Sequence, residues 1–144
     1  MPRIKLDLPG NFSYSIVIPL RITDLNYGGH VGNDSFLSLL HEARIQFLRH
    51  HGYSEMDIDG YGMIMSDVVI EFRQELFYGD SIQVWVTASG FTNISFDIFY
   101  KIEKTSGEKS TIAAQAKTGM VCFDYNKKKV SAIPDSVRNI LSHL

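Results

Sequence analysis

A long stretch of helical periodicity, residues 33–51, constrains the fold of this chain more than any other feature. Apolar side chains recur at the spacing of one helix face at five positions: Phe36, Leu39, Leu40, Ala43 and Phe47. Three further apolar residues lie off that face: Leu37, Ile45 and Leu48. A helix that is apolar over so much of its circumference has to be enclosed by other elements.

Both ends of this helix carry recognisable signals. Asn33, Asp34 or Ser35 can cap the unpaired amides of the first turn, and a carboxylate at position 34 suits the positive end of the helix dipole. Gly52 can adopt the left-handed conformation that stops a helix. We therefore expect one helix of about five turns.

Strand signals cover most of the remaining sequence. Apolar and polar residues alternate near residues 13–20, 82–88 and 94–103, and two further strands are expected near 63–72, which is rich in Ile, Val and Met, and near 111–123, between two turns. Pro19 has no backbone N–H, so the end of the first strand should lie at a sheet edge or a bulge. Pro134 opens a short final helix.

The order of these elements restricts the fold class. Several strands in succession without intervening helices do not fit the strand–helix alternation of a doubly wound domain. The order favours an α+β fold in which one antiparallel sheet of five or six strands wraps around the long helix. At 144 residues the chain has the length of one domain, and we expect residues 1–144 to form it.

Composition and charge exclude several classes of protein. The 14 Lys and Arg residues face 16 Asp and Glu residues, so a basic nucleic-acid-binding surface is not expected. The single cysteine, Cys122, provides neither a disulfide framework nor a thiolate zinc site. No stretch has the roughly 20 apolar residues of a membrane span, and the amino terminus lacks a secretory signal. We expect a cytoplasmic protein without a bound metal.

Residues 24–33 carry the clearest chemical signal. Three glycines lie within this short segment: Gly28, Gly29 and Gly32. They lead directly into the long helix, where exposed amides at the positive end of the dipole stabilise a phosphate or an oxyanion. Their spacing matches neither nucleotide-phosphate fingerprint. Four polar residues share the loop and favour a function over an ordinary connection: Asp24, Asn26, His30 and Asn33.

Three motifs together resemble a known family. They are the run from Arg21 to Asn33, the Glu42-Ala43-Arg44 triplet and the Tyr78-Gly79-Asp80 turn. In this order they are similar to the 4-hydroxybenzoyl-CoA thioesterase-like branch of the hotdog-fold acyl-thioesterases. The resemblance implies a hotdog subunit that forms a homodimer or homotetramer with active sites at the subunit interface. It also implies hydrolysis of an acyl-CoA or acyl-carrier-protein thioester without a metal or an organic cofactor.

The family pattern implies a catalytic carboxylate that this chain lacks. In the branch, the second Asp of a D-x-D element is catalytic, whereas the two positions here are Asp24 and Asn26. An amide side chain cannot act as a general base or as the attacking anion. Asn26 and His30 instead resemble an Asn and His found in plant acyl-carrier-protein thioesterases of this fold. We expect a water oriented by Asn26 to attack, with His30 or a carboxylate from the facing strand or the partner subunit taking its proton.

Further residues complete the expected site. The amides from Val31 to Asn33 are expected to hold the oxyanion, and Tyr27 and Gly29 to contact the substrate. Ser66 either contacts the substrate as well or, like Asp67, forms a hydrogen bond at the subunit interface. Asp24 acts either in catalysis or in the structure of the turn, where Arg21 could pair with it.

Other polar residues have less specific interpretations. Glu42 could face the site as a base, but an ion pair better explains charges such as Glu42 and Arg44 inside a long helix. Cys122 is more consistent with a small buried side chain than with a nucleophile. Residues 89–93 lack the basic cluster that meets nucleotide phosphates in the bacterial 4-hydroxybenzoyl-CoA enzyme, and Lys127–Lys129 could replace it.

The sequence therefore favours a thioesterase, with one alternative of a different class. A non-catalytic hotdog module that binds acyl thioesters as a sensor or scaffold would explain the amide at position 26. A hotdog dehydratase would need an Asp and His pair in a hydratase-type motif, which the sequence does not contain.

Overall fold

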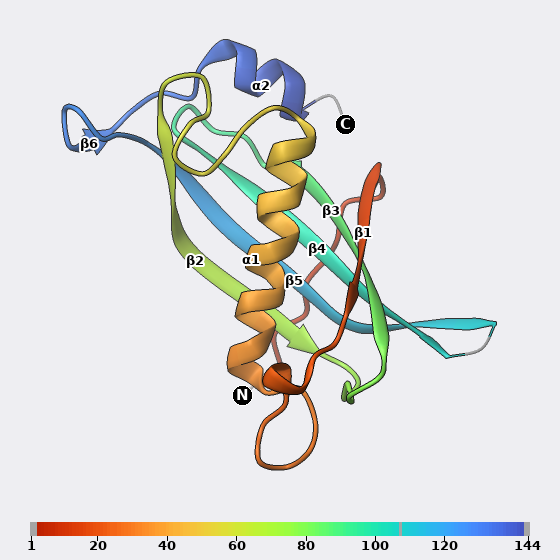
Figure 1. The fold of residues 1–144 in the computed structure, drawn as a ribbon. Coiled ribbons are helices and arrows are strands. Elements are labelled where there is room, and N and C mark those ends of the chain that lie inside the picture. Colours follow the sequence, from red (N-terminus) through yellow and green to blue (C-terminus); the bar gives the residue numbers. More distant parts are fainter. Residues whose placement is uncertain (1–2, 107, 143–144) are drawn as a thin grey trace.

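The computed structural model of the protein describes residues 3–106 and 108–142. Its elements are β1 (Tyr14–Pro19), the 3-10 helix η1 (Ile22–Asp24), α1 (Asn33–His50), β2 (Gly62–Phe72), β3 (Ser81–Ser89), β4 (Ser95–Ser106), β5 (Lys109–Asp124), β6 (Lys129–Val130) and α2 (Asp135–Ser142). Figure 1 shows α1 lying across one face of a curved sheet. The predicted architecture, an antiparallel sheet around one long helix with a short C-terminal helix, is confirmed.

The sheet has six antiparallel strands in the order β1-β3-β4-β5-β2, with β6 paired to β5. β1 and β2 form its two edges. Pro19 lies at the end of the edge strand β1, opposite Ser81, so its missing N–H interrupts no central ladder, as the sequence predicted. The short strand β6 was not predicted, because two residues carry too little periodicity to be recognised.

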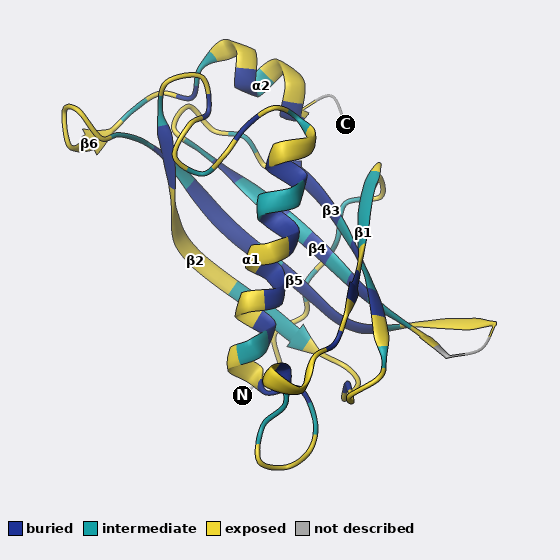
Figure 2. Cartoon of the chain, in the orientation of Figure 1, coloured by how far each residue is buried: buried dark blue, intermediate teal, exposed yellow. Residues whose placement is uncertain are grey.

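The core lies between α1 and the face of the sheet that it covers. The helix buries the five residues of the predicted apolar face, and Phe47 is fully inaccessible to solvent. The facing strands contribute alternate residues that are equally buried, including Val84, Val86, Tyr100 and Ile102. Figure 2 shows the buried residues of α1 on its sheet-facing side, and exposed residues in the middle of β2.

The helix begins differently from the prediction. Its N-cap is Gly32, in an extended conformation and without a side-chain cap, rather than Asn33, Asp34 or Ser35. The carbonyl of Gly32 accepts the amide of Phe36 at 3.2 Å, which places Asn33 already inside the first turn. The other end agrees with the prediction, because the helix stops at His50 and Gly52 has a φ of +82°.

α2 and the segment 52–61 close the end of the fold where α1 terminates. The Arg138 guanidinium lies 5.8 Å from the ring centroid of Phe91 and donates to the carbonyl of Thr92, which fixes α2 to the turn before β4. Within residues 3–106 and 108–142, neither helix has an apolar stretch long enough to cross a bilayer.

Residues 3–13, which we call the N-terminal strap, cross the sheet on the face opposite α1. The strap follows a row of side chains that the strand register places next to one another: Glu71, Gln115, Lys101 and Trp85. The Leu6 N–H donates to Glu71 at 2.9 Å, and the Leu6 carbonyl accepts from Gln115 at 3.2 Å. Farther along, the Lys101 ammonium lies 5.2 Å from the ring centroid of Phe12. Figure 1 shows this segment behind the sheet before it enters β1.

Candidate functional site

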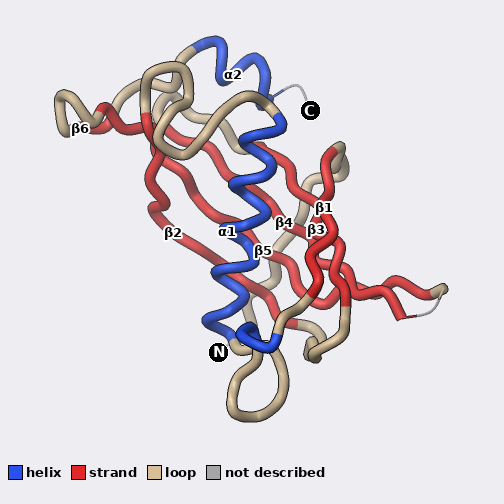
Figure 3. Tube along the Cα trace, in the orientation of Figure 1, coloured by secondary structure: helices blue, strands red, loops and turns tan. Residues whose placement is uncertain are grey.

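The glycine-rich loop 25–32 forms a tight turn beyond the start of α1 (Figure 3). Leu25 and Val31 pair as an isolated antiparallel bridge, and the Asn26 N–H donates to the carbonyl of His30 at 2.8 Å. Gly29 sits at the tip with a φ of +81°, a conformation that residues with a Cβ rarely adopt. Backbone geometry therefore explains why glycine stands at this position.

The loop is held against the segment between β2 and β3. The Val31 N–H donates to the carbonyl of Leu76 at 2.8 Å, and His30 forms a bridge with Phe77. The Tyr78-Gly79-Asp80 motif orders the end of this segment, because the Asp80 carboxylate accepts the Phe77 N–H at 2.9 Å. Two regions that are far apart in sequence thus meet at the start of α1.

A cleft of about 270 Å³ opens where these segments meet α1. It is lined by His30, Val31, Asn33, Phe36, Phe72, Arg73, Gln74 and Glu75. The rings of Phe36 and Phe72 pack edge to face with their centroids 4.9 Å apart, which gives the cleft an apolar wall. It thus combines an aromatic surface with polar groups at a helix N-terminus.

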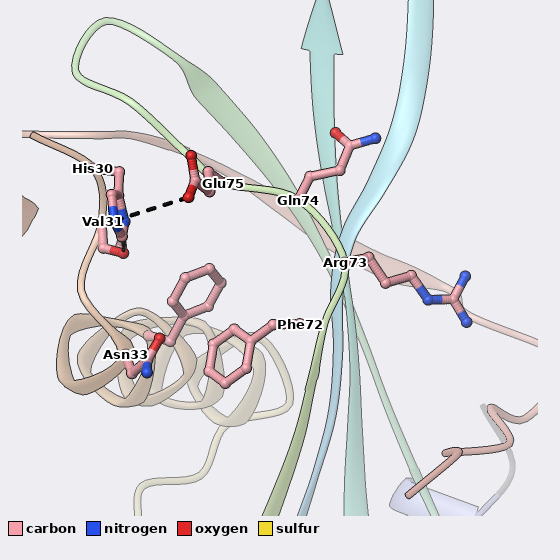
Figure 4. A pocket seen from close by; sticks show the side chains of 8 residues that line it. His30, Val31, Asn33, Phe72, Arg73, Gln74 and Glu75 are labelled. Carbon is pink, nitrogen blue, oxygen red and sulfur yellow. Dashed lines mark hydrogen bonds and ion pairs between the residues drawn. The ribbon is translucent and has the colours of Figure 1, made fainter. Parts of the chain in front are cut away.

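His30 has its two ring nitrogens in different environments. Nδ1 lies 3.2 Å from the carbonyl oxygen of Val31, and because a carbonyl only accepts, Nδ1 carries the hydrogen. In the neutral ring Nε2 is then unprotonated and free to accept a proton. Nε2 faces Glu75, whose Oε1 lies 4.0 Å away (Figure 4). The side chain of His30 is about one-third exposed.

The other charged residue of the cleft lining points elsewhere. Figure 4 shows the Arg73 side chain directed away from His30. Its Nε donates to Glu71 at 2.7 Å, next to the N-terminal strap. Within the described lining, Glu75 is therefore the charged group that faces the histidine.

The start of α1 offers fewer free amides than the sequence suggested. The Val31 N–H is bonded to Leu76, and the Gly32 N–H donates to the carbonyl of Asp24 at 3.3 Å. Asn33, the first helical residue, lines the cleft, and amides of the first turn have no acceptor within the helix. Of the three expected amides, that of Asn33 is the one the fold leaves for a ligand.

The structure brings three of the predicted site residues to the cleft: His30, Val31 and Asn33. It does not bring the other five there. The Asn26 Oδ1 accepts the Gly28 N–H at 2.8 Å within the loop, and Tyr27 and Gly29 lie at the exposed tip. The Ser66 hydroxyl, on β2, donates to the carbonyl of Gly119 at 3.2 Å.

Asp24 is buried beneath the loop and has the contacts of a structural residue. Its Oδ2 accepts the backbone N–H of Arg21 at 2.8 Å, and its Oδ1 lies 3.6 Å from the Arg21 guanidinium. The expected pairing with Arg21 is thus present. Asp24 closes η1 and positions the strand-to-loop turn rather than lining the cleft.

The Glu42-Ala43-Arg44 triplet is divided between surface and core. Arg44 is buried, and its guanidinium donates to Glu55 at 3.0 Å and to the Tyr100 hydroxyl at 3.2 Å. Burial alone would lower the pKa of Arg44, but Tyr100 and Glu55 hold that pKa above its ordinary value. The partner of Arg44 is therefore Glu55, whereas Glu42 lies at the surface beside a second cavity.

The remaining candidates do not add chemistry to the cleft. Cys122 is buried, and burial raises the pKa of its thiol, as expected for an inert residue. Across the described part of the chain, no group of three or more His, Cys, Asp or Glu residues is placed to hold a metal ion. Lys127 and Lys128 lie in the turn before β6 and Lys129 is its first residue, at the opposite end of the fold from the glycine-rich loop (Figure 1).

Sequence reasoning did not identify Glu75, Phe72 or Phe36 as site residues. It anticipated a carboxylate from a facing segment, but the chain contains 16 acidic residues and no pattern distinguishes one of them. The pairing of Val31 with Leu76 joins segments about 45 positions apart, and this contact selects Glu75. One feature of the sequence could have pointed to Glu75 as a site residue: it lies shortly before the Tyr78-Gly79-Asp80 motif.

Comparison with known proteins shows which family and fold this chain resembles. A 1,4-dihydroxy-2-naphthoyl-CoA hydrolase of Microcystis aeruginosa is 28% identical over 126 residues, which cover 85% of this chain and 88% of that protein. The acyl-CoA thioester hydrolase YbgC of Escherichia coli is 25% identical, with 83% and 90% covered. A solved structure of Slr0204, a 1,4-dihydroxy-2-naphthoyl-CoA thioesterase from Synechocystis, superimposes with a TM-score of 0.79 at 21% identity, covering 89% of this chain and 94% of that one.

The structural likeness confirms the expected hotdog fold. The family model of the thioesterase-like superfamily matches residues 20–141, from the end of β1 to α2. The match includes the glycine-rich loop, the long helix and every strand after it. The chain therefore belongs to the thioesterase-like superfamily.

Proposed function

We propose that this protein hydrolyses acyl-CoA thioesters in the cleft at the start of α1. One observation carries the proposal: His30, whose Nδ1 lies against the Val31 carbonyl, lines a cleft that also contains the first residue of a helix, Asn33. A base and an oxyanion donor are the two groups that attack of water on a thioester requires. The names of the two sequence relatives, both hydrolases of CoA thioesters, support the choice of substrate class.

In the proposed reaction, His30 accepts a proton from water while the water oxygen attacks the thioester carbonyl carbon. The carbonyl oxygen gains negative charge and is stabilised by the amide of Asn33 and by the helix dipole. When the C–S bond breaks, the imidazolium returns the proton to the departing thiolate. The products are a carboxylic acid and the free thiol.

Asn26 has a different role in this proposal from the one expected of it. Because its Oδ1 is already bonded to the Gly28 N–H, we assign it to ordering the loop that carries His30. Water is then oriented by His30 itself. The loop residues Tyr27 and Gly29 remain candidates for contact with the substrate where it enters the cleft.

Substitutions at Asn26 separate the two roles. Asn26→Ala removes the acceptor of the Gly28 N–H, and we expect kcat to fall at least tenfold as the loop loses its conformation. Asn26→Asp keeps an oxygen acceptor at the same place, so its kcat should stay within about threefold of the original. A large gain in activity for Asn26→Asp would instead show that a carboxylate at position 26 acts directly on the substrate.

A panel of thioesters tests the function itself. Purified protein is assayed by thiol release with alkanoyl-CoA esters of graded chain length and with aroyl-CoA esters. We expect turnover of at least one class well above the uncatalysed rate, and the aromatic wall of Phe36 and Phe72 favours an aroyl or branched group. Binding of several esters without turnover of any would favour the alternative, an acyl-thioester sensor.

CoA is the carrier that we propose, with the cytoplasm as the compartment. The lysines at 127–129 lie at the other end of the fold from the cleft, so the carrier is not assigned from them (Figure 1). Assaying the same acyl group on CoA and on acyl-carrier protein decides between the carriers. A reducing cytoplasm agrees with the free, buried thiol of Cys122.

We further propose that two copies pair along β2, which places each cleft at the subunit interface. β2 is an edge of the sheet, and its exposed middle carries Ile64, Met65 and Val68. The helix adds Leu37, which lines a cavity together with Met65, distinct from both the cleft and the cavity beside Glu42. Phe72, at the end of the same strand, lines the catalytic cleft, so a partner on β2 would border it.

A charge on this edge should separate the two copies. For Met65→Glu we expect the dimer dissociation constant to rise roughly a hundredfold, because an unpaired carboxylate buried at an interface costs about 3 kcal/mol. Light scattering coupled to size-exclusion chromatography measures the change. Val17→Glu is the matched control, since Val17 is exposed on β1, at the opposite edge of the sheet from β2. An unchanged dimer in Met65→Glu would rule out β2 as the interface.

A further inference from the structure

We infer that Glu75 is a positioning residue for catalysis, which stabilises the imidazolium that forms on His30 as water attacks. The inference rests on the proposed hydrolysis and adds a group that the sequence motifs do not contain. Its basis is the geometry of the cleft, where Glu75 Oε1 lies 4.0 Å from His30 Nε2.

The separation suits an electrostatic role. At 4.0 Å the two atoms are farther apart than in a hydrogen bond, so the neutral imidazole keeps its Nε2 lone pair for water. Once Nε2 is protonated, a carboxylate at this distance attracts the new positive charge. Glu75 thus favours the protonated state that forms during the reaction without blocking the base before it.

The backbone around Glu75 fixes its position in the cleft. The next residue, Leu76, accepts the Val31 N–H, so the Glu75 segment and the His30 loop are joined by a hydrogen bond of 2.8 Å. On the other side, Lys104 donates to the Glu75 carbonyl at 3.5 Å and lies 3.2 Å from Asp80. Only the side chain of Glu75 is therefore free to adjust.

Other charged groups near this pair are already engaged. Arg73 is bonded to Glu71, Lys104 pairs with Asp80, and Asp24 pairs with Arg21 beneath the loop. On α1, Asp34 lies close to Gly32 in the first turn, at the N-terminal end of the helix. Within the described residues, Glu75 is the carboxylate whose oxygen lies 4.0 Å from the Nε2 of His30.

The test compares Glu75→Gln and Glu75→Asp with the original protein at low and at high salt. For Glu75→Gln we expect kcat to fall about five- to tenfold at low salt, with KM nearly unchanged. High salt should shrink this difference in kcat, since Glu75 is about two-thirds exposed.

Controls distinguish this role from a structural one. Glu103→Gln makes the same change in net charge on β4, outside the cleft lining, and should leave kcat and its salt dependence unchanged. Glu75→Asp keeps a carboxylate and should restore part of the lost kcat. If the original protein turns over and Glu75→Gln matches it in kcat at low salt, the role of Glu75 is refuted while the hydrolase proposal stands. If the original protein turns over no thioester, the proposed function fails first.

Discussion

His30→Ala should reduce kcat for thioester hydrolysis by about 100-fold, within the range expected for loss of a general base. The variant lacks the nitrogen that accepts the proton of water, while the cleft, Asn33 and the aromatic wall remain. KM should change little, because the imidazole acts on water and has no role in holding the acyl group. Steady-state kinetics with the best ester of the panel measures both values.

The control for this prediction is another histidine of the same chain. His50 lies exposed at the end of α1, where its ring is 4.8 Å from that of Tyr14, and His50→Ala should keep full activity. Circular dichroism should show unchanged secondary structure in both variants. Activity of His30→Ala within threefold of the original would exclude His30 as the base and would direct attention to a residue of the partner subunit.

The second large effect is expected on stability, for Arg44→Met. The change removes the cation that Glu55 and the Tyr100 hydroxyl share, in a place that water hardly reaches. Removing one member of a buried ion pair costs about 3–5 kcal/mol, and we expect about 3 kcal/mol here, because His41 still lies 3.0 Å from Glu55. Chemical denaturation at fixed protein concentration measures the loss.

Two further variants test the cause of that loss. Arg49→Met removes an exposed arginine from the last turn of the same helix and should cost less than about 1 kcal/mol. The double variant Arg44→Met with Glu55→Gln should regain part of the stability, because no carboxylate is then left without its main cation. A loss for Arg44→Met as small as that for Arg49→Met would contradict a buried pair.

The sequence predicted the elements because their patterns are local. The apolar face of α1 and the alternation in β3 and β4 each lie within a few helical turns or a few consecutive residues. The loop before α1 was also recognisable, since three glycines next to a helix have few other uses. The predicted N-cap residue was wrong for a physical reason. The carbonyl of Gly32 accepts the first helical hydrogen bond, so Gly32 is the N-cap and Asn33 is the first residue of the helix.

The site was predictable only in part because its contacts join distant segments. His30 and Asn33 lie on the recognisable loop and do reach the cleft. Asn26 lies on the same loop, yet its side chain bonds to a backbone amide two residues away, a choice that no sequence pattern reveals. Glu75 lies at the cleft because Val31 pairs with Leu76, a contact between distant segments. Arg44 likewise bonds to Glu55, eleven residues away, and not to Glu42 in its own motif.

The N-terminal strap has a consequence for how copies of the protein can assemble. Anything that approaches the sheet from the side away from α1 meets residues 3–13 before it meets β3, β4 or β5. Stacking two sheets back to back would require peeling the strap off and breaking the bonds of Leu6 to Glu71 and Gln115. Joining β2 edges sideways requires no such rearrangement, so the first contacts between copies should extend the sheet within its own plane.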